Sequence, residues 1–172
     1  MSDPTSPGPP DGGPADPDDL AAVGAQLGRP SRGVAAVGHR CPCGRPDVLT
    51  TLPQLPDGTP FPTTFYATCP RLTGAISTLE SAGMMRDMSA RLESDPDLAA
   101  AYRAAHEDYL ARRAALGEVA QIAGISAGGM PTRVKCLHVL AAHALAAGPG
   151  VNPLGDEVIA ALDPWWRGEP CV

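Results

Sequence analysis

The sequence predicts an α+β domain, a small antiparallel sheet of about three strands packed by about five helices. Two observations carry this prediction. Between residues 32 and 69, short runs rich in β-branched and aromatic residues are separated by Gly/Pro turns, as in a meander of strands. From residue 70 onward, apolar residues recur at helical spacing, with prolines and glycines where helices begin and end.

The N-terminal segment MSDPTSPGPPDGGPADPDD contains six prolines, three glycines and five aspartates, but no aromatic or basic residue. Such a segment buries too little apolar surface to offset its ordering entropy. We therefore expect residues 1–19 to be a disordered acidic tail and residues 20–172 to form a single domain. Removing the five tail acids moves the formal charge from −6 to −1 (−6 + 5), so the domain itself is nearly neutral.

The first predicted helix follows the tail, because Leu20, Val23 and Leu27 share one helical stripe. Asp18 is its candidate cap, and Gly28 ends it. Three strands are predicted next, separated by the turns CPCGRP and PDGTP; they are 32–40, 47–52 and 63–69.

Helical patterns occupy most of the remaining chain. The longest is capped by Asp95 and begins at Pro96, where the missing proline N–H costs nothing. Pro131 is expected to open the helix that contains RVKCLHVLAAHALAA. The predicted helices are 70–83, 84–92, 95–116, 131–147 and 154–162.

The composition limits the classes of binding partner and the subcellular location that we expect. No stretch reaches the ~20 apolar residues that cross a bilayer, and no basic-then-apolar leader is present. We therefore expect a cytoplasmic protein whose five cysteines are free thiols or metal ligands. Twelve arginines and one lysine are interleaved with carboxylates, which argues against nucleic-acid binding.

The cysteines lie at predicted element ends, where a fold can bring them together. The predicted metal ligands are Cys41, Cys43, Cys69 and Cys136, with His39 or Cys171 as alternative donors. Four such ligands would hold zinc or an iron–sulfur cluster, and the residues do not decide between the two. The alternatives are inert buried thiols with no cofactor, or a redox-active or nucleophilic thiol.

The stretch KCLHVLAAH cannot chelate an ion alone if it is helical throughout. Cys136 and His138 would then lie about 200° apart around the helix axis. Cys136 and His143 would share a stripe but stand ~10 Å apart along it. A metal at Cys136 therefore needs ligands from elsewhere in the chain.

A second motif is the glycine-rich GISAGGMPTRVK, which runs into a predicted helix start. Backbone N–H groups there can bind an anion, and the candidate residues are Gly128, Gly129, Arg133 and Lys135. Lys135 is the chain's only lysine, which favours a specific role for it. One such role is to fill a tight pocket that admits the narrow lysine ammonium but not a guanidinium. A plain flexible connector is the alternative.

A family resemblance is carried by three segments, HRCPCGRPDV, LPDGTPFPTTFYATCP and SAGGMPTRVKCLHVLAAHALAAGPGVNPLGD. Through these segments the chain resembles domain-of-unknown-function family 501, which is common in actinobacteria. The resemblance covers roughly residues 20–160 and implies no established activity. It implies genes nearby for a septum-formation protein and an exopolyphosphatase. Its pattern falls on Cys41, Cys69, Lys135, Cys136, His138, Asn152, Pro153 and Gly155. We expect His138 to face away from Cys136 and to bond the GVNP turn.

Three functional hypotheses follow. The first is a non-catalytic or regulatory protein whose cysteine cluster binds zinc or an iron–sulfur centre. The second is an enzyme acting on an anionic or phosphorylated substrate, with Cys136, Lys135 or His138 as the catalytic group. The third is a metal-free interaction protein that docks a partner through Trp165 and Trp166, although closure over the core is the commoner fate of such a pair. The sequence leaves the oligomeric state open.

Overall fold

The computed structural model describes residues 10–168, 170 and 171 and confirms the α+β class. In chain order the elements are β1 (Pro10–Gly13), α1 (Pro17–Leu27), β2 (Val34–Arg40), β3 (Pro46–Thr51), β4 (Phe65–Ala67), α2 (Pro70–Ser81), α3 (Met84–Ser94), α4 (Pro96–Ala114), the short 3-10 helix η1 (Ala120–Ile122), α5 (Leu137–Ala147) and α6 (Pro153–Ala161).

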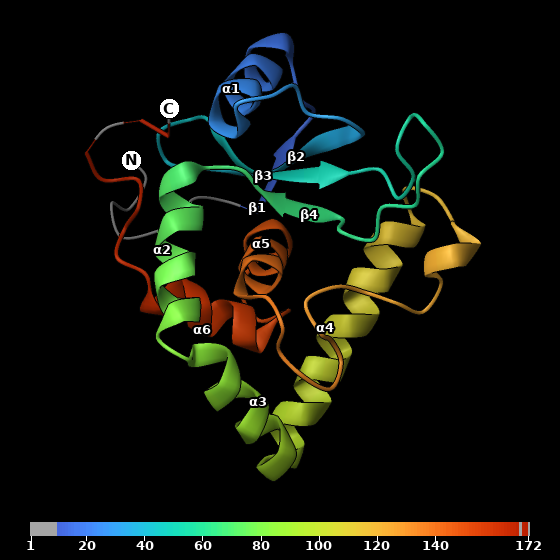
Figure 1. Cartoon of the computed structure of the whole chain (residues 1–172), viewed down its shortest axis with the longest axis vertical. Coiled ribbons are helices and arrows are strands. Elements are labelled where there is room, and N and C mark those ends of the chain that lie inside the picture. Colours follow the sequence, from blue (N-terminus) through green and yellow to red (C-terminus); the bar gives the residue numbers. More distant parts are fainter. Residues whose placement is uncertain (1–9, 169, 172) are drawn as a thin grey trace.

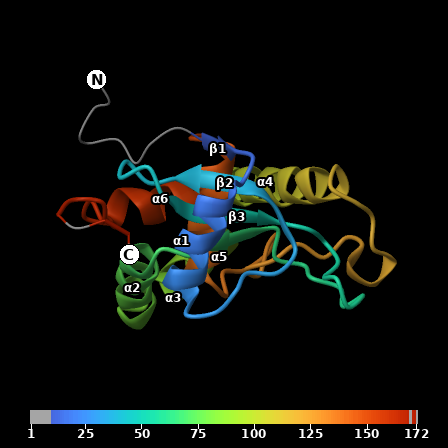
Figure 2. The same ribbon diagram turned by 90° about the horizontal axis from the view of Figure 1, so that it is seen from above.

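The four strands form one antiparallel sheet in the order β1-β2-β3-β4. Helix α1 lies over one face of the sheet, and α5 packs against the opposite face (Figure 1, Figure 2). Helices α2, α4 and α6 surround α5, while α3 joins α2 to α4 at the end remote from the sheet (Figure 1). Helix α5 contacts all four strands and is therefore the centre of the core.

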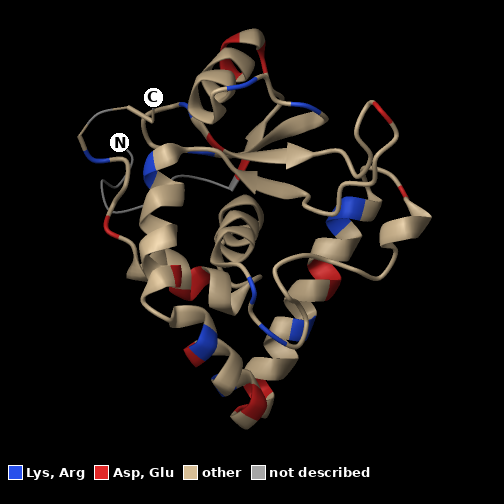
Figure 3. Cartoon of the chain, viewed as in Figure 1, with Lys and Arg blue, Asp and Glu red and all other residues tan. Residues whose placement is uncertain are grey.

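The position of α5 follows from its composition. LHVLAAHALAA carries no Lys, Arg, Asp or Glu, and eight of its eleven residues are buried. A helix that is apolar on all sides is stable only when other elements cover it on all sides. Figure 3 shows the complementary pattern, with charged residues on α1, α3 and α4 and none on α5.

The N-terminal prediction needs correction where the structure describes it. Residues 10–13 form an additional edge strand, β1, and Asp16 rather than Asp18 caps α1. The Asp16 side chain accepts from the Asp19 N–H (2.8 Å), and the Asp19 carboxylate accepts from the Asp16 N–H (3.1 Å), which is a reciprocal capping box. Tertiary pairing with β2 supplies stability that local composition does not indicate. Residues 1–9 lie outside the described residues.

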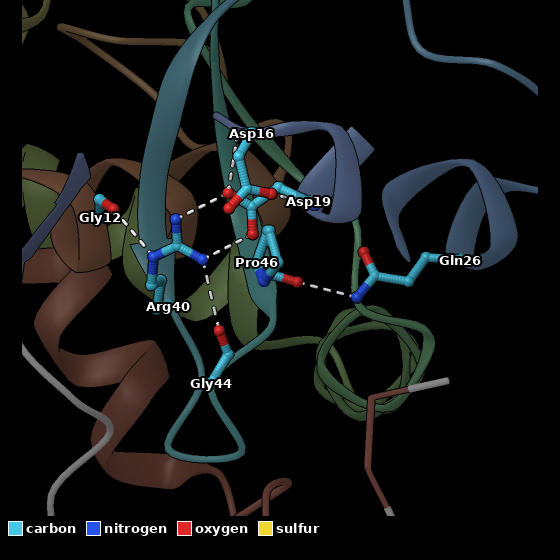
Figure 4. Close-up of polar contacts among 7 residues, drawn as sticks. All are labelled: Gly12, Asp16, Asp19, Gln26, Arg40, Gly44 and Pro46. Carbon is cyan, nitrogen blue, oxygen red and sulfur yellow. Dashed lines mark hydrogen bonds and ion pairs between the residues drawn. The ribbon is translucent and has the colours of Figure 1, made fainter. Parts of the chain in front are cut away.

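Arg40, the last residue of β2, holds this region together (Figure 4). Its guanidinium forms a two-pronged ion pair with Asp19 (2.6 and 2.7 Å) and also donates to the carbonyls of Gly12 (2.9 Å) and Gly44 (3.3 Å). The paired guanidinium lowers the pKa of the Asp19 carboxyl. Arg40 thereby joins α1, β1 and the turn after β2, which places that turn.

Helix α5 begins later than predicted. It starts at Leu137, and Cys136 is its N-cap residue with an extended backbone (φ −154°, ψ 111°). Residues 128–135 form a closed loop instead, because the N–H groups of Arg133 and Lys135 donate to the carbonyls of Gly129 (3.2 Å) and Gly128 (2.7 Å). Cys136 therefore lies before the first turn of the helix. The predicted separation of Cys136 and His138 around the helix axis assumed that both residues are helical, and this assumption is wrong.

Candidate functional site

Four of the five cysteines meet beside the first turn of α2, where the C-terminal segment returns to the sheet (Figure 1). The sulfurs of Cys41, Cys43 and Cys171 all lie within 4.8 Å of one another, and Cys43 Sγ is 3.3 Å from Cys171 Sγ. The Cys69 thiol also contacts Cys171, although it is not part of the mutually close set. All of these cysteines are free thiols.

Local structure places each of these thiols. After β2 the chain reverses in a tight turn in which Gly44 N–H donates to the Cys41 carbonyl (2.8 Å). Gly44 has φ 91°, a conformation that glycine adopts without strain. Cys69 is the N-cap residue of α2 and is followed by Pro70, as the strand-to-helix pattern predicted. Three of the sulfurs, on Cys41, Cys69 and Cys171, are buried, whereas Cys43 is exposed.

The crowding of thiols changes their acidity. Cys171 shares its S–H with the sulfurs of Cys41 and Cys69, which lowers the pKa of both to about 7 and raises the pKa of Cys171 itself. Backbone N–H groups add to this effect, from Cys43 toward Cys41 and from the first residues of α2 toward Cys69. The nearby Asp47 carboxylate acts in the opposite direction. The site thus favours thiolate at two of its positions.

His39, an alternative ligand from the sequence, is engaged differently. Its Nδ1 lies 2.6 Å from Asp47 Oδ1, and both side chains are almost completely buried (1% and 0% exposed). His39 Nε2 and Asp47 Oδ2 have no hydrogen-bond partner among the described residues. His39 is not among the mutually close donors of the thiol cluster. Its visible role is the buried pair with Asp47.

Cys136 lies in a second cluster and does not join the other cysteines. Its sulfur is grouped with Glu80 and His138, the three donor atoms lying within 4.8 Å of one another. Glu80 is near the end of α2, whereas Cys69 caps the start of that helix. At ~1.5 Å per residue the two positions are about 16 Å apart along the axis. The structure therefore brings Cys171, and not Cys136, to Cys41, Cys43 and Cys69.

The second cluster is a connected polar network. Glu80 Oε1 accepts from the backbone N–H of Leu137 (2.8 Å) and lies 3.1 Å from His138 Nδ1. His138 Nε2 lies 3.1 Å from the carbonyl oxygen of Thr73. Since both ring nitrogens face oxygen acceptors, the doubly protonated imidazolium satisfies both contacts.

The Cys136 thiol completes the network. Its sulfur lies within 4.8 Å of a ring nitrogen of His138 and raises the pKa of the imidazole to about 9, with further support from the Thr73 carbonyl and Glu80. Burial opposes ionisation of Cys136, but the His138 contact and the nearby Val139 N–H outweigh it and lower the pKa of the thiol. The Val139 N–H lies close to the sulfur without closing a full capping hydrogen bond. The His138 imidazole thus lies between a sulfur whose pKa is lowered and the Glu80 carboxylate.

We expect the Cys136→Ser variant to lower the pKa of His138 from about 9 toward the ~6.5 of a free imidazole, because the largest contribution is removed. The Glu80→Gln variant, which keeps an acceptor for the Leu137 N–H, should lower it less. The measurement is a titration of the ring protons by NMR, with the His138 signal assigned by its loss in a His138→Gln spectrum. An unchanged value in Cys136→Ser would refute the assigned contact.

The same shift has a defined sign for stability. The pKa of His138 is raised on folding, so its stabilising contribution is complete below the unfolded value of ~6.5 and is lost as the pH rises through about 9.

The glycine-rich loop does not form the predicted anion-binding site. The N–H groups of Met130, Arg133 and Lys135 donate to carbonyls of the same loop, and that of Val134 donates to Ser89 Oγ (3.0 Å). The first N–H of α5 is occupied by the Glu80 carboxylate. Gly128 and Gly129 have φ values of 68° and 93° because the loop closes on itself. Arg133 and Lys135 are exposed, so the tight pocket expected around Lys135 is wrong.

The GVNP turn is bound by His143, not by His138. Asn152 Nδ2 lies 3.2 Å from His143 Nδ1, and Asn152 Oδ1 accepts from the Gly155 N–H (2.9 Å) to cap α6. On its other side His143 Nε2 lies 2.8 Å from Asp108 Oδ2. Because the amide N–H donates to Nδ1, the proton of the neutral ring is on Nε2. His143 is completely buried and has a structural role.

The tryptophan pair closes over the core. Trp165 is 6% exposed and belongs to the central apolar cluster, and Trp166 packs against it with its ring at 84° to the first. Trp165 is therefore not a free docking residue, and its replacement with alanine would disturb packing.

Two site residues were missed or placed second by the sequence. Cys171 stood only as an alternative donor, although its thiol interacts with all three of Cys41, Cys43 and Cys69 and therefore lies at the centre of the cluster. Glu80 was not singled out at all. The available signal for Glu80 was its place as the only acidic residue of the segment 70–83, at the helix end where acidic side chains are unfavourable.

Within the described residues, the structure contains no helix with the length and apolar character needed to span a membrane. No curated protein and no solved structure matches the chain. The model of the protein family of unknown function DUF501 matches residues 37–160, a range that includes Cys41, Cys43, Cys69 and Cys136 but not Cys171. The chain therefore belongs to the DUF501 family.

Proposed function

We propose that this protein binds one zinc ion through Cys41, Cys43, Cys69 and Cys171, and that the ion has a structural or regulatory role rather than a catalytic one. The observation that carries the proposal is the spacing of the sulfurs, three of them within 4.8 Å of one another and the fourth in contact with Cys171. Thiolates at Zn–S distances of ~2.3 Å in a tetrahedron stand about 3.8 Å apart. Zinc binding would draw the three close sulfurs together and would move the Cys69 sulfur, which lies outside the mutually close set, to that spacing.

The thiols and their surroundings fit zinc chemically. Four cysteines fill a tetrahedral site and leave no open position for a substrate, which is the pattern of a structural zinc centre. Backbone N–H groups directed at Cys41 and Cys69 stabilise ligand thiolates. An iron–sulfur cluster would place inorganic sulfide and more than one iron between the cysteines and would spread their sulfurs farther apart. The compact spacing therefore favours a single ion.

The ligands come from distant parts of the chain. Cys43 and Cys171 are 128 positions apart, and the ion would tie the C-terminal segment to the sheet and to α2. Such a connection suits a reducing compartment such as the cytoplasm, where free thiols persist and disulfides do not.

The test is elemental analysis of the full chain, purified anaerobically with a reductant. We expect one zinc per chain and no inorganic sulfide. Cys41→Ser and Cys171→Ser should lose the ion, whereas the matched control Cys136→Ser should keep it, because Cys136 belongs to the other cluster. Cobalt loading should produce thiolate-to-metal absorption that disappears in Cys171→Ser. Metal-free protein, or a Cys43–Cys171 disulfide under these conditions, would contradict the proposal.

A further inference from the structure

We propose that Cys136 is a reactive thiolate that small electrophiles, hydroperoxides in particular, modify, with His138 and Glu80 as its positioning residues. This site is separate from the proposed zinc centre and does not depend on it. The inference rests on the contacts of three side chains that meet where the end of α2 faces the start of α5.

The trio has the residue types of a metal site, but its contacts argue for an ion-paired network. His138 has no ring nitrogen free for a metal, because Nδ1 faces Glu80 (3.1 Å) and Nε2 faces the Thr73 carbonyl (3.1 Å). Glu80 Oε1 already accepts from the Leu137 N–H. Metal ligation by His138 would require at least one of these contacts to break.

The geometry favours the ionised sulfur. Cys136 is the N-cap residue of α5, beside the helix end where unpaired N–H groups stabilise negative charge. His138 lies in the first turn and contacts the sulfur as an imidazolium. Glu80 holds the ring by its Nδ1 and simultaneously anchors the first N–H of α5, so the ring and the sulfur are positioned by one carboxylate.

Reagents can reach this cysteine. Cys136 is partly exposed, whereas Cys41, Cys69 and Cys171 are buried. The exposed Cys43 lies in the other cluster, where zinc would occupy its sulfur. Lys135, which precedes Cys136 in the chain, and Ser77, which contacts His138, are both exposed to solvent. Cys136 is thus the accessible thiol that no proposed metal would protect.

The reaction with a hydroperoxide balances with water as the only further component. The Cys136 thiolate attacks one peroxide oxygen, an S–O bond forms and the O–O bond breaks. The sulfur is oxidised to sulfenic acid, and the peroxide is reduced to hydroxide or alkoxide. The leaving hydroxide or alkoxide takes its proton from water, because both ring nitrogens of His138 are engaged with Glu80 and the Thr73 carbonyl.

The experiment measures the alkylation rate of each cysteine by peptide mass spectrometry, using iodoacetamide on zinc-replete full chain between pH 5 and 10. We expect the rate at Cys136 to inflect clearly below the ~8.5 of a free thiol. His138→Gln should move the inflection toward ~8.5 and slow alkylation at pH 6.5 by roughly 10-fold or more, since one pKa unit changes the thiolate fraction about tenfold. The control Ser77→Ala removes a hydroxyl that donates to the Thr73 carbonyl (2.9 Å) and lies 3.4 Å from the ring. It leaves Glu80 and the Thr73 carbonyl facing His138, so its rate should stay within about twofold of the parent.

A second arm treats the protein with hydrogen peroxide and traps sulfenic acid with a cyclic diketone. The adduct should form on Cys136 and be absent in Cys136→Ser. If His138→Gln does not fold, the pH profile of the unmodified chain and the trapping decide the question. An inflection at or above ~8.5, or no adduct on Cys136, overturns the proposal and leaves the zinc proposal untouched.

Discussion

Replacing Gly155 with alanine is expected to destabilise the fold by about 3 kcal/mol or more, the upper range for overpacking a core. Gly155 lies in α6 at its crossing with α5. A Cβ added there would clash with the carbonyl oxygen of Leu140 and would stand 2.8 Å from Ala144 Cβ. The obstructing atom is backbone inside a buried helix, so it cannot rotate away. The helices would have to separate at the centre of the core.

Gly74 provides a matched control for this variant. It also lies inside a helix, α2, but a Cβ added there would meet nothing within 4 Å. Gly74→Ala should therefore raise stability by about 0.5–1 kcal/mol through helix propensity alone. Urea denaturation of both variants measures the difference. Equal midpoints for Gly155→Ala and the parent protein would show that the helices do not cross as closely as described.

Removing the proposed zinc ion is expected to produce the second large effect. A ligand that binds only the folded state at 1,000 times its Kd contributes about 4.1 kcal/mol, and structural zinc binds at least this tightly. A strong chelator should therefore lower the melting temperature of the reduced protein by many degrees. Thermal unfolding with and without chelator gives the measurement.

Two variants show whether the cysteine cluster causes this effect. Cys171→Ser should melt at the chelated temperature and should not respond to chelator, because its ion is already lost. Cys136→Ser should keep the full response, since its sulfur is grouped with Glu80 and His138 instead. A parent protein that melts at the same temperature with and without chelator would contradict a structural metal.

The family resemblance includes Asn152 and Gly155, and the structure supplies a physical reason for both. Asn152 caps α6 through the Gly155 N–H and also binds the buried His143. Gly155 allows the closest approach of α6 to α5. The residues of this pattern around the GVNP turn thus have packing roles, whereas for Cys136 and His138 we propose a chemical role.

Local chemistry made much of the fold predictable. Asp95 caps α4 by accepting from the N–H groups of Asp97 and Leu98, as the Asp-Pro pair indicated. Gly28 ends α1 in the left-handed conformation. Pro70 follows the cap of α2. Each of these features depends on residues within one helical turn, so the sequence alone contains the information.

The segments that the sequence misplaced depend on distant contacts. β1 forms from a Pro/Asp/Gly-rich stretch because β2 pairs with it. Helix α5 begins at Leu137 rather than Pro131 because Glu80, 57 positions earlier, accepts the Leu137 N–H. Neither neighbour is visible in the local pattern.

The sequence by itself therefore determined the α+β class, the family and the presence of thiols at element ends. Only the tertiary structure decided that Cys171 joins Cys41, Cys43 and Cys69, while Cys136 joins His138 and Glu80. The reason is physical. Capping and amphipathic periodicity act over a few residues, whereas the distance between two sulfurs 128 positions apart depends on how the sheet, α2 and the C-terminal segment pack together.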